Sequence, residues 1–143
     1  MKVKQISIFL ENKSGRLADV THALGNSDIN IRALSIADTS DFGILRLIVN
    51  DPTKALSILK DEGFTVSQTD VIAVEVSDSP GGLAAALDAL KTENINIEYM
   101  YAFIEKSSND ALVVFRVEEI TRAISLLENE GFNLLSANKV YEL

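Results

Sequence analysis

Alternating hydrophobic and polar positions mark the start of each half of the chain. Residues 3–10 alternate, with Ile6, Ile8 and Leu10 on one face, and residues 72–76 repeat the pattern. A period of two is typical of a β-strand with one buried face. We therefore expect a strand at both places.

Each of these strands is followed by a glycine-containing turn and then by hydrophobic positions three or four residues apart. This spacing predicts an amphipathic helix after each turn. A second helix is expected from Asp51, because Asp is a good N-cap and Pro52 suits the first helical position. Its counterpart should begin near Glu118. The hydrophobic positions that define the first helices are Leu17, Val20, Leu24, Leu83, Leu87 and Leu90.

Helix ends and further strands complete the pattern in each half. Both second helices should end at Glu-Gly-Phe, at Gly63 and Gly131, because glycine takes the left-handed conformation that closes a helix. The remaining strands are expected over about 31–38, 43–49 and 64–69, and again over about 97–105, 111–117 and 133–141. The order in each half is β-α-β-β-α-β, which predicts the α+β class. We expect two ferredoxin-like repeats, residues 1–70 and 71–143, each an antiparallel sheet with helices on one face.

The two halves also match each other residue by residue. An offset of 66 residues places Gly15, Leu17 and Ile29-Asn30-Ile31 on Gly81, Leu83 and Ile95-Asn96-Ile97. Later in each half an offset of 68 places Glu62-Gly63-Phe64 on Glu130-Gly131-Phe132. The two extra residues are assigned to the polar turn 106–110, where a hairpin tolerates insertion. The chain is therefore expected to be a tandem repeat.

Composition excludes several classes of function. The net charge of −8 and the absence of a basic stripe argue against nucleic acid as a partner. Without cysteine and with one histidine, thiolate chemistry, a metal site and a serine–histidine relay are not expected. No run of about 18 apolar residues and no signal peptide is recognisable, so we expect no membrane association and a cytoplasmic protein.

The turn before each first helix is the first candidate binding site. A helix N-terminus offers N–H groups and a partial positive charge, which suit a carboxylate, and glycine lets a ligand approach the main chain. Glu11 and Asp78 are near enough in sequence to accept an ammonium. A bulky residue at Gly81 or Gly82 is expected to abolish binding and leave the fold intact. The candidate residues are Glu11, Asn12, Ser14, Gly15, Arg16 and Leu17, and Asp78, Ser79, Pro80, Gly81, Gly82 and Leu83.

The entry to the second strand of each half is the second candidate. An asparagine amide both donates and accepts hydrogen bonds, which suits a zwitterion. The same sequences also fit ordinary turn chemistry, with Ser79 as a helix cap and Pro80 as the first helical residue. The residues alone leave both interpretations open. The candidates at the strand entries are Asn30, Ile31, Asn94, Asn96 and Ile97.

The combination of features resembles the ACT domain family, twice, over essentially the whole chain. The second copy, with Ser79-Pro80-Gly81-Gly82-Leu83 and a later Asn-Ile, is the closer match. The first copy lacks the proline and carries Lys13 and Arg16 instead. The resemblance implies a non-catalytic regulatory protein without a cofactor. It implies that a small amino acid binds at interfaces between modules and that the protein modulates a partner enzyme in trans.

The predicted strands also favour association. Helices cover one face of each sheet, yet strand positions such as Tyr101 and Ala102 are apolar on both faces. We therefore expect a homodimer.

Two other functions stay open at this point. One is a structural or interaction subunit that binds no ligand. The other is an acylphosphatase-like hydrolase, for which Arg16 and Asn12 or Asn30 supply the residue types but the glycine-rich phosphate loop is missing.

Overall fold

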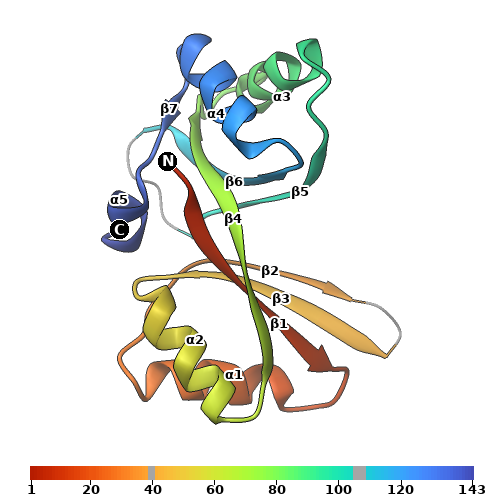
Figure 1. The fold of residues 1–143 in the computed structure, drawn as a ribbon, viewed down its shortest axis with the longest axis vertical. Coiled ribbons are helices and arrows are strands. Elements are labelled where there is room, and N and C mark those ends of the chain that lie inside the picture. The colour runs from red at the N-terminus through yellow and green to blue at the C-terminus, as the bar shows by residue number, and fades with distance from the viewer. Residues whose placement is uncertain (39–40, 105–108) are drawn as a thin grey trace. The chain divides into compact units, whose positions relative to one another are not determined.

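The chain forms two compact units that repeat one order of elements (Figure 1). The computed structural model describes residues 1–38, 41–104 and 109–143. One unit comprises Lys4–Thr69, and the other comprises Asp70–Leu143 together with Met1–Val3. We refer to them as the N-terminal and the C-terminal module.

The N-terminal module has a sheet in the order β2-β3-β1-β4. β3 pairs antiparallel with both β1 and β2, so β2 is the edge strand. β1 and β2 are therefore parallel to each other, and β3 lies between them, as a split βαβ unit requires. The elements are β1 (Val3–Glu11), α1 (Arg16–Gly25), β2 (Ile31–Asp38), β3 (Phe42–Val49), α2 (Pro52–Asp61) and the first part of β4 (Thr65–Val76).

The C-terminal module repeats this arrangement with strand order β5-β6-β4-β7. The predicted β-α-β-β-α-β order is therefore confirmed in both halves. The elements after β4 are α3 (Gly82–Thr92), β5 (Ile97–Ala102), β6 (Ala111–Val117), α4 (Ile120–Asn129), β7 (Asn133–Leu134) and α5 (Ala137–Tyr141).

Two predictions about strands are corrected by the structure. The last strand is wrong over 133–141, because β7 ends at Leu134 and α5 follows. Ser136 caps α5, since its hydroxyl accepts a hydrogen bond from the Lys139 N–H at 3.3 Å. In addition, the strands expected over 64–69 and 72–76 are one continuous strand, β4. The turn 106–110 lies partly outside the described residues.

The second helices begin and end as expected. The Asp51 carboxylate accepts a hydrogen bond from the Lys54 N–H at 3.1 Å at the start of α2. At its end, Gly63 has φ +86° and its N–H donates to the Lys60 carbonyl at 3.0 Å, while the following N–H donates to the Leu59 carbonyl. These bonds form a Schellman motif, which recurs at Gly131.

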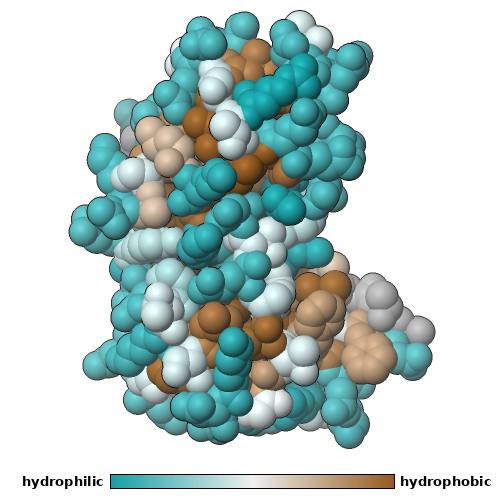
Figure 2. All heavy atoms as spheres, in the orientation of Figure 1, coloured by the Kyte–Doolittle hydropathy of each residue, from teal (hydrophilic) through white to brown (hydrophobic). Residues whose placement is uncertain are grey.

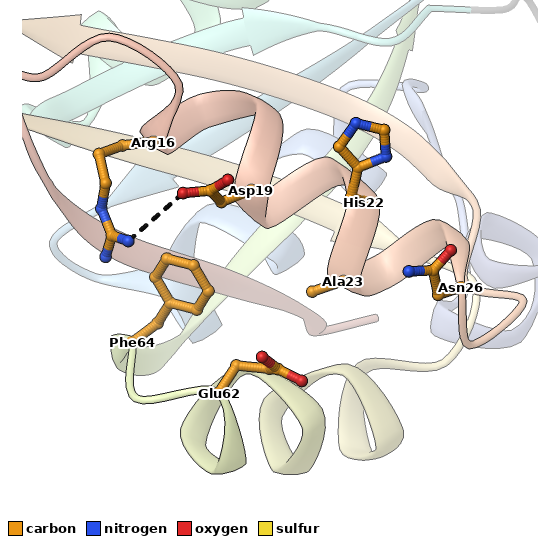
Figure 3. Close-up of a pocket in the computed structure, with 7 residues that line it drawn as sticks. All are labelled: Arg16, Asp19, His22, Ala23, Asn26, Glu62 and Phe64. Carbon is orange, nitrogen blue, oxygen red and sulfur yellow. Dashed lines mark ion pairs between the residues drawn. The ribbon is translucent and has the colours of Figure 1, made fainter.

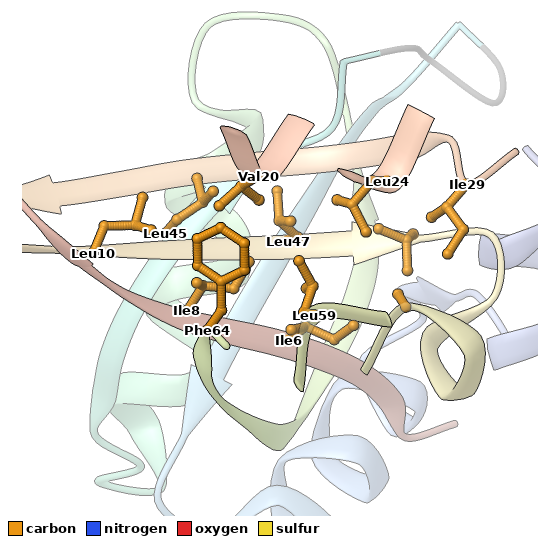
Figure 4. Packing of buried hydrophobic residues seen from close by; sticks show 12 residues of the cluster. Ile6, Ile8, Leu10, Val20, Leu24, Ile29, Leu45, Leu47, Leu59 and Phe64 are labelled. Atoms are coloured by element: carbon orange, nitrogen blue, oxygen red, sulfur yellow. The ribbon is translucent and has the colours of Figure 1, made fainter. Parts of the chain in front are cut away.

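The core of each module lies between its sheet and its two long helices. Figure 4 shows this packing in the N-terminal module, where strand and helix side chains meet in one layer. The predicted helix positions Val20 and Leu24 are buried there, and Leu90 is buried in the C-terminal core. The N-terminal cluster contains Ile6, Ile8, Leu10, Val20, Leu24, Ile29, Leu45, Leu47, Val49, Ala55, Leu59 and Phe64.

Candidate functional site

Left-handed glycines precede the first helix of each module. Gly15 has φ +88° at the N-cap of α1, and Gly81 has φ +85° at the N-cap of α3. Among the described residues no side chain caps either helix. A Cβ added at Gly15 or Gly81 would meet no atom within 4 Å. Each of these glycines therefore borders open surface. Because the Arg16 and Gly82 N–H groups donate to the Lys13 and Ser79 carbonyls, the donors left for a ligand acceptor are the next N–H groups of α1 and α3.

Gly82 has a different role from the one expected. It is buried, and a Cβ there would lie 1.8 Å from the main-chain oxygen of Ser77. A side chain at this position would therefore displace the turn, so the expectation that a bulky Gly82 variant keeps its fold is wrong. Glycine is required here by the protein's own main chain.

The alternative explanation of the second turn, with Ser79 as the cap of α3, is also wrong. Ser79 and Ser77 join their hydroxyls at 2.7 Å, and the Ser79 carbonyl accepts a hydrogen bond from the Gly82 N–H at 3.0 Å. The helix begins at Gly82 after the left-handed Gly81. Asp78, Ser79, Pro80 and Gly81 are exposed in this turn. The two serine hydroxyls therefore form a hydrogen bond within the turn and do not cap the helix.

The N-terminal turn carries an internal ion pair. Lys13 Nζ lies 2.7 Å from Glu11 Oε2. The hydrogen bond and the charge of Lys13 hold the pKa of Glu11 below its usual value. Because a lowered pKa keeps the carboxyl ionised, this pair persists at neutral pH and is lost as pH falls through the lowered pKa. Glu11, which was expected to accept a ligand ammonium, is therefore already engaged by Lys13.

Arg16 occupies the first position of α1 and lies over an aromatic ring. Its guanidinium carbon is 4.7 Å from the centre of the Phe64 ring, and Nη1 is 3.5 Å from Asp19 Oδ2. Figure 3 shows both groups at one end of a pocket of about 300 Å³ that also includes His22 and Glu62. Cation–π contact with a ring this close restricts the guanidinium. Arg16 is therefore a positioned cation and not a mobile surface charge.

The residues at the strand entries stabilise the turns of their own module. Asn94 follows α3 and has the left-handed conformation, with φ +56°. The amide of Asn96 donates to Glu118 Oε1 at 3.2 Å, and the Asn30 N–H donates to Asn50 Oδ1 at 2.9 Å. A shallow pocket of about 410 Å³ nevertheless gathers Asn94, Asn96 and the half-buried Ile97, with Leu87 and Lys91 beside them.

The structure groups the predicted residues into two sets in each module. In the N-terminal module Glu11, Asn12, Arg16 and Leu17 line a pocket of about 190 Å³ together with Ile36 of β2. Ser14 and Gly15 are exposed in the same turn. Asn30 and the half-buried Ile31 lie past the other end of α1. Ten helical residues span about 15 Å, so one module does not bring the turn and the strand entry together.

Sequence reasoning missed the aromatic residues around the N-terminal turn. Phe9, Phe42 and Phe64 line a pocket of about 180 Å³ with Glu11 and Arg16. Phe9 and Phe42 are 47% and 54% exposed. The sequence did carry one indication: Phe9 lies between the core positions Ile8 and Leu10, so its side chain points to the opposite face of the strand. A large aromatic residue on the non-core face of a strand indicates a surface with another use.

Other kinds of site find no support in the part of the chain that the structure describes. It holds no group of three or more His, Cys, Asp or Glu side chains arranged to bind a metal ion. Within the same residues no helix has the length and apolar character needed to cross a membrane.

Comparisons with known proteins agree with this fold. A model of the ACT domain pair matches residues 1–143. Protein BT0572 from Bacteroides thetaiotaomicron has a similar crystal structure, with a TM-score of 0.94, 47% identity and coverage of 100% of this chain and 98% of that one. No curated protein matches in sequence.

More distant structures share the fold alone. The regulatory subunit of aspartate kinase from Thermus thermophilus matches with a TM-score of 0.64 and 18% identity, over 90% of this chain and 92% of that one. The corresponding subunit from Thermus flavus matches with a TM-score of 0.61 and 19% identity, over 87% and 88%.

Proposed function

The chain belongs to the family of ACT domain pairs, and on this premise we propose that it is a non-catalytic regulatory protein that binds a small amino acid. The observation that carries the proposal is the left-handed glycine at the uncapped start of α1 and of α3. A ligand carboxylate bonded to the first N–H groups of the helix supplies the missing acceptor. The similar structures of regulatory aspartate kinase subunits agree with a regulatory role.

The ammonium of the ligand needs acceptors from elsewhere, because Lys13 engages Glu11 in the N-terminal turn. The amides of Asn30 and Asn96 at the strand entries are suitable, since an amide oxygen accepts from an ammonium. They lie at the far end of the first helix of their own module. We therefore propose that each amino acid contacts the turn of one module and the strand entry of another module.

The ligand then acts by stabilising one association of modules over another. Binding that differs between two arrangements shifts the balance between them, and a partner enzyme that prefers one arrangement responds. The protein itself needs no catalytic group or cofactor for this role.

A screen of the twenty common amino acids by thermal shift tests the proposal. A ligand that binds the native state raises the melting temperature by mass action. The Gly81→Ala variant should lose at least about tenfold in affinity for the amino acid that is found, because its methyl group would occupy the open space beside the turn, where the ligand is proposed to bind. Calorimetry measures the loss.

Gly131→Ala is the matched control. Gly131 has φ +88°, and a Cβ there also meets no atom within 4 Å, so the conformational cost of about 1 kcal/mol should be similar in the two variants. Unchanged affinity in Gly81→Ala, or an equal loss in both variants, would show that the turn does not bind the ligand.

We also propose that the protein is a homodimer that uses the edge strand β2. Leu34 and Ile36 pair in register with the core residues Leu47 and Leu45, so all four side chains share the helix-covered face. Leu34 and Ile36 are nevertheless 43% and 48% exposed, beside the 42% exposed Leu17 of α1. An apolar edge strand with unpaired main-chain groups is a typical association surface.

Light scattering should therefore give twice the chain mass of 15.6 kDa at micromolar concentration. The double variant Leu34→Lys/Ile36→Lys should give a monomer with an unchanged circular dichroism spectrum. Ile104→Lys, at a position that is 61% exposed in the other module, is the control and should remain dimeric. A monomeric unmodified protein would exclude the proposed dimer.

A further inference from the structure

A second small pocket lies at the end of the N-terminal sheet where β1 ends and β3 and β4 begin. Its volume is about 180 Å³, and Phe9, Phe42, Phe64, Arg16 and Glu11 lie around it. It is distinct from the pocket of about 190 Å³ that Arg16 also lines, since that one includes Leu17 and Ile36 but no phenylalanine. Arg16 therefore lines one pocket with Leu17 and Ile36 and another with three phenylalanines.

Two of the three aromatic walls, Phe9 and Phe42, come from the face of the sheet that the helices do not cover, whereas Phe64 belongs to the core. Phe9 pairs with Ile44, and Glu11 pairs with Phe42, in the antiparallel register of β1 and β3. Residues two apart on a strand share a face, so Phe9, Glu11, Phe42 and Ile44 lie together, opposite the core. Figure 2 shows hydrophobic side chains at the surface of this module near the end of β1 and the start of β3. Two half-exposed phenyl rings therefore border the pocket.

The cationic end of the pocket is Arg16, whose donors are incompletely used. The buried Arg16 Nε has no hydrogen-bond partner among the described residues. The contact of Nη1 with Asp19 is 3.5 Å, beyond the usual range of a charge-assisted hydrogen bond. A guanidinium has five N–H donors and binds a carboxylate through two of them at once. The charge of Arg16 is therefore only partly compensated by its neighbours and can attract an added anion.

The C-terminal module lacks all of these features except one ring. The repeat places Glu75, Asp110 and Gly82 at the positions of Phe9, Phe42 and Arg16, whereas Phe132 matches Phe64. The fold thus requires the buried Phe64 position but neither the exposed rings nor the arginine. The two exposed rings of one module stand where the other has carboxylates, and the arginine stands where the other has glycine, so the pocket is a property of the N-terminal module.

We propose that this pocket binds a small carboxylate that carries one aromatic ring and no ammonium group. The carboxylate bonds to the Arg16 guanidinium, and the ring lies against Phe9 and Phe42, where offset or edge-to-face contact is favourable. An ammonium would meet Arg16 and Lys13, and Glu11 is already paired with Lys13 at 2.7 Å. An apolar cavity of about 150 Å³ holds a benzene molecule, so the pocket has room for a single ring.

This ligand is separate from the amino acid of the proposed function, so either proposal can fail without the other. Calorimetry of the intact protein with 3-phenylpropanoate should show saturable binding to one site per chain. The uncharged analogue 3-phenylpropanamide and the non-aromatic 3-cyclohexylpropanoate should both bind at least about tenfold more weakly. Equal affinity for the amide, or no saturable binding of 3-phenylpropanoate, would overturn the proposal.

Variants locate the site. Arg16→Gln and Phe42→Ser should each weaken 3-phenylpropanoate binding by about 10- to 100-fold, and Arg16→Lys should retain part of the affinity. Arg122→Gln is the matched control, because Arg122 is an ion-paired surface arginine of the other module, and its affinity should be unchanged. If Arg16→Gln and Phe42→Ser bound 3-phenylpropanoate as tightly as the unmodified protein, the assignment of the ligand to this pocket would be overturned.

The Phe42 variant also separates the two proposals. Phe42 does not line the pocket that contains Asn12 and Leu17, so Phe42→Ser should keep its affinity for the amino acid. Loss of both ligands in Phe42→Ser, with a native melting temperature, would show that the aromatic pocket is not a separate site.

Discussion

Replacing Gly82 with alanine should lower the free energy of unfolding by about 3 kcal/mol. The methyl group would lie 1.8 Å from the Ser77 carbonyl oxygen. The oxygen is part of the main chain and the methyl carbon is attached directly to it, so no side-chain rotation relieves the overlap. The turn must move, and the hydrogen bond from the Gly82 N–H to Ser79 is strained with it. Urea denaturation measures the effect as a lower transition midpoint.

Gly81→Ala is the matched control for this result. It is the preceding residue, it has φ +85°, and a Cβ there meets no atom within 4 Å. Its expected cost is the left-handed strain of about 1 kcal/mol alone. A Gly82 variant as stable as the Gly81 variant would contradict the proposed close packing of the turn. The comparison also shows which of the two glycines is suitable for binding experiments.

Replacing Phe115 with alanine should lower the free energy of unfolding by about 3–5 kcal/mol. Phe115 lies on β6 with no exposed surface and belongs to the C-terminal core. Its removal loses the transfer free energy of the ring and leaves a cavity that the surrounding side chains fill only in part. The thermal or urea unfolding transition measures this loss.

Phe42→Ala is the counterpart with the same chemical change. Phe42 is 54% exposed, so its removal should change stability by less than about 1 kcal/mol. A large loss in Phe42→Ala would mean that this ring holds the fold together, and would weaken the case for a ligand surface. A small loss in Phe115→Ala would contradict the described core.

Much of the fold could be predicted from the sequence, because the patterns are local and repeat. Alternation in residues 3–10 and helical spacing after Leu17 gave the first strand and helix, and Asp51-Pro52 gave the start of α2. α5 was missed because symmetry with the first half favoured a strand. The local signal was present, since Ser136 is a good N-cap for the following residues.

The candidate site could be predicted only in part, because some of its features depend on contacts in three dimensions. Glycine and helix spacing indicated the turns at Gly15 and Gly81, and both are left-handed as such turns require. The role of Gly82 depends on its distance to Ser77, and the pairing of Glu11 with Lys13 depends on side-chain geometry. Neither contact has a signature in residue order, so only the structure could identify them.

The central claim is that the first main-chain N–H groups of α1 or α3 bind the ligand. Nuclear magnetic resonance of the nitrogen-15-labelled protein, titrated with the amino acid that the thermal screen identifies, tests it directly. The account predicts that the largest shifts fall on the second and third helical amides, which are Leu17 and Ala18 in α1 or Leu83 and Ala84 in α3. Saturable binding that leaves these four amides unmoved and shifts signals elsewhere would contradict it.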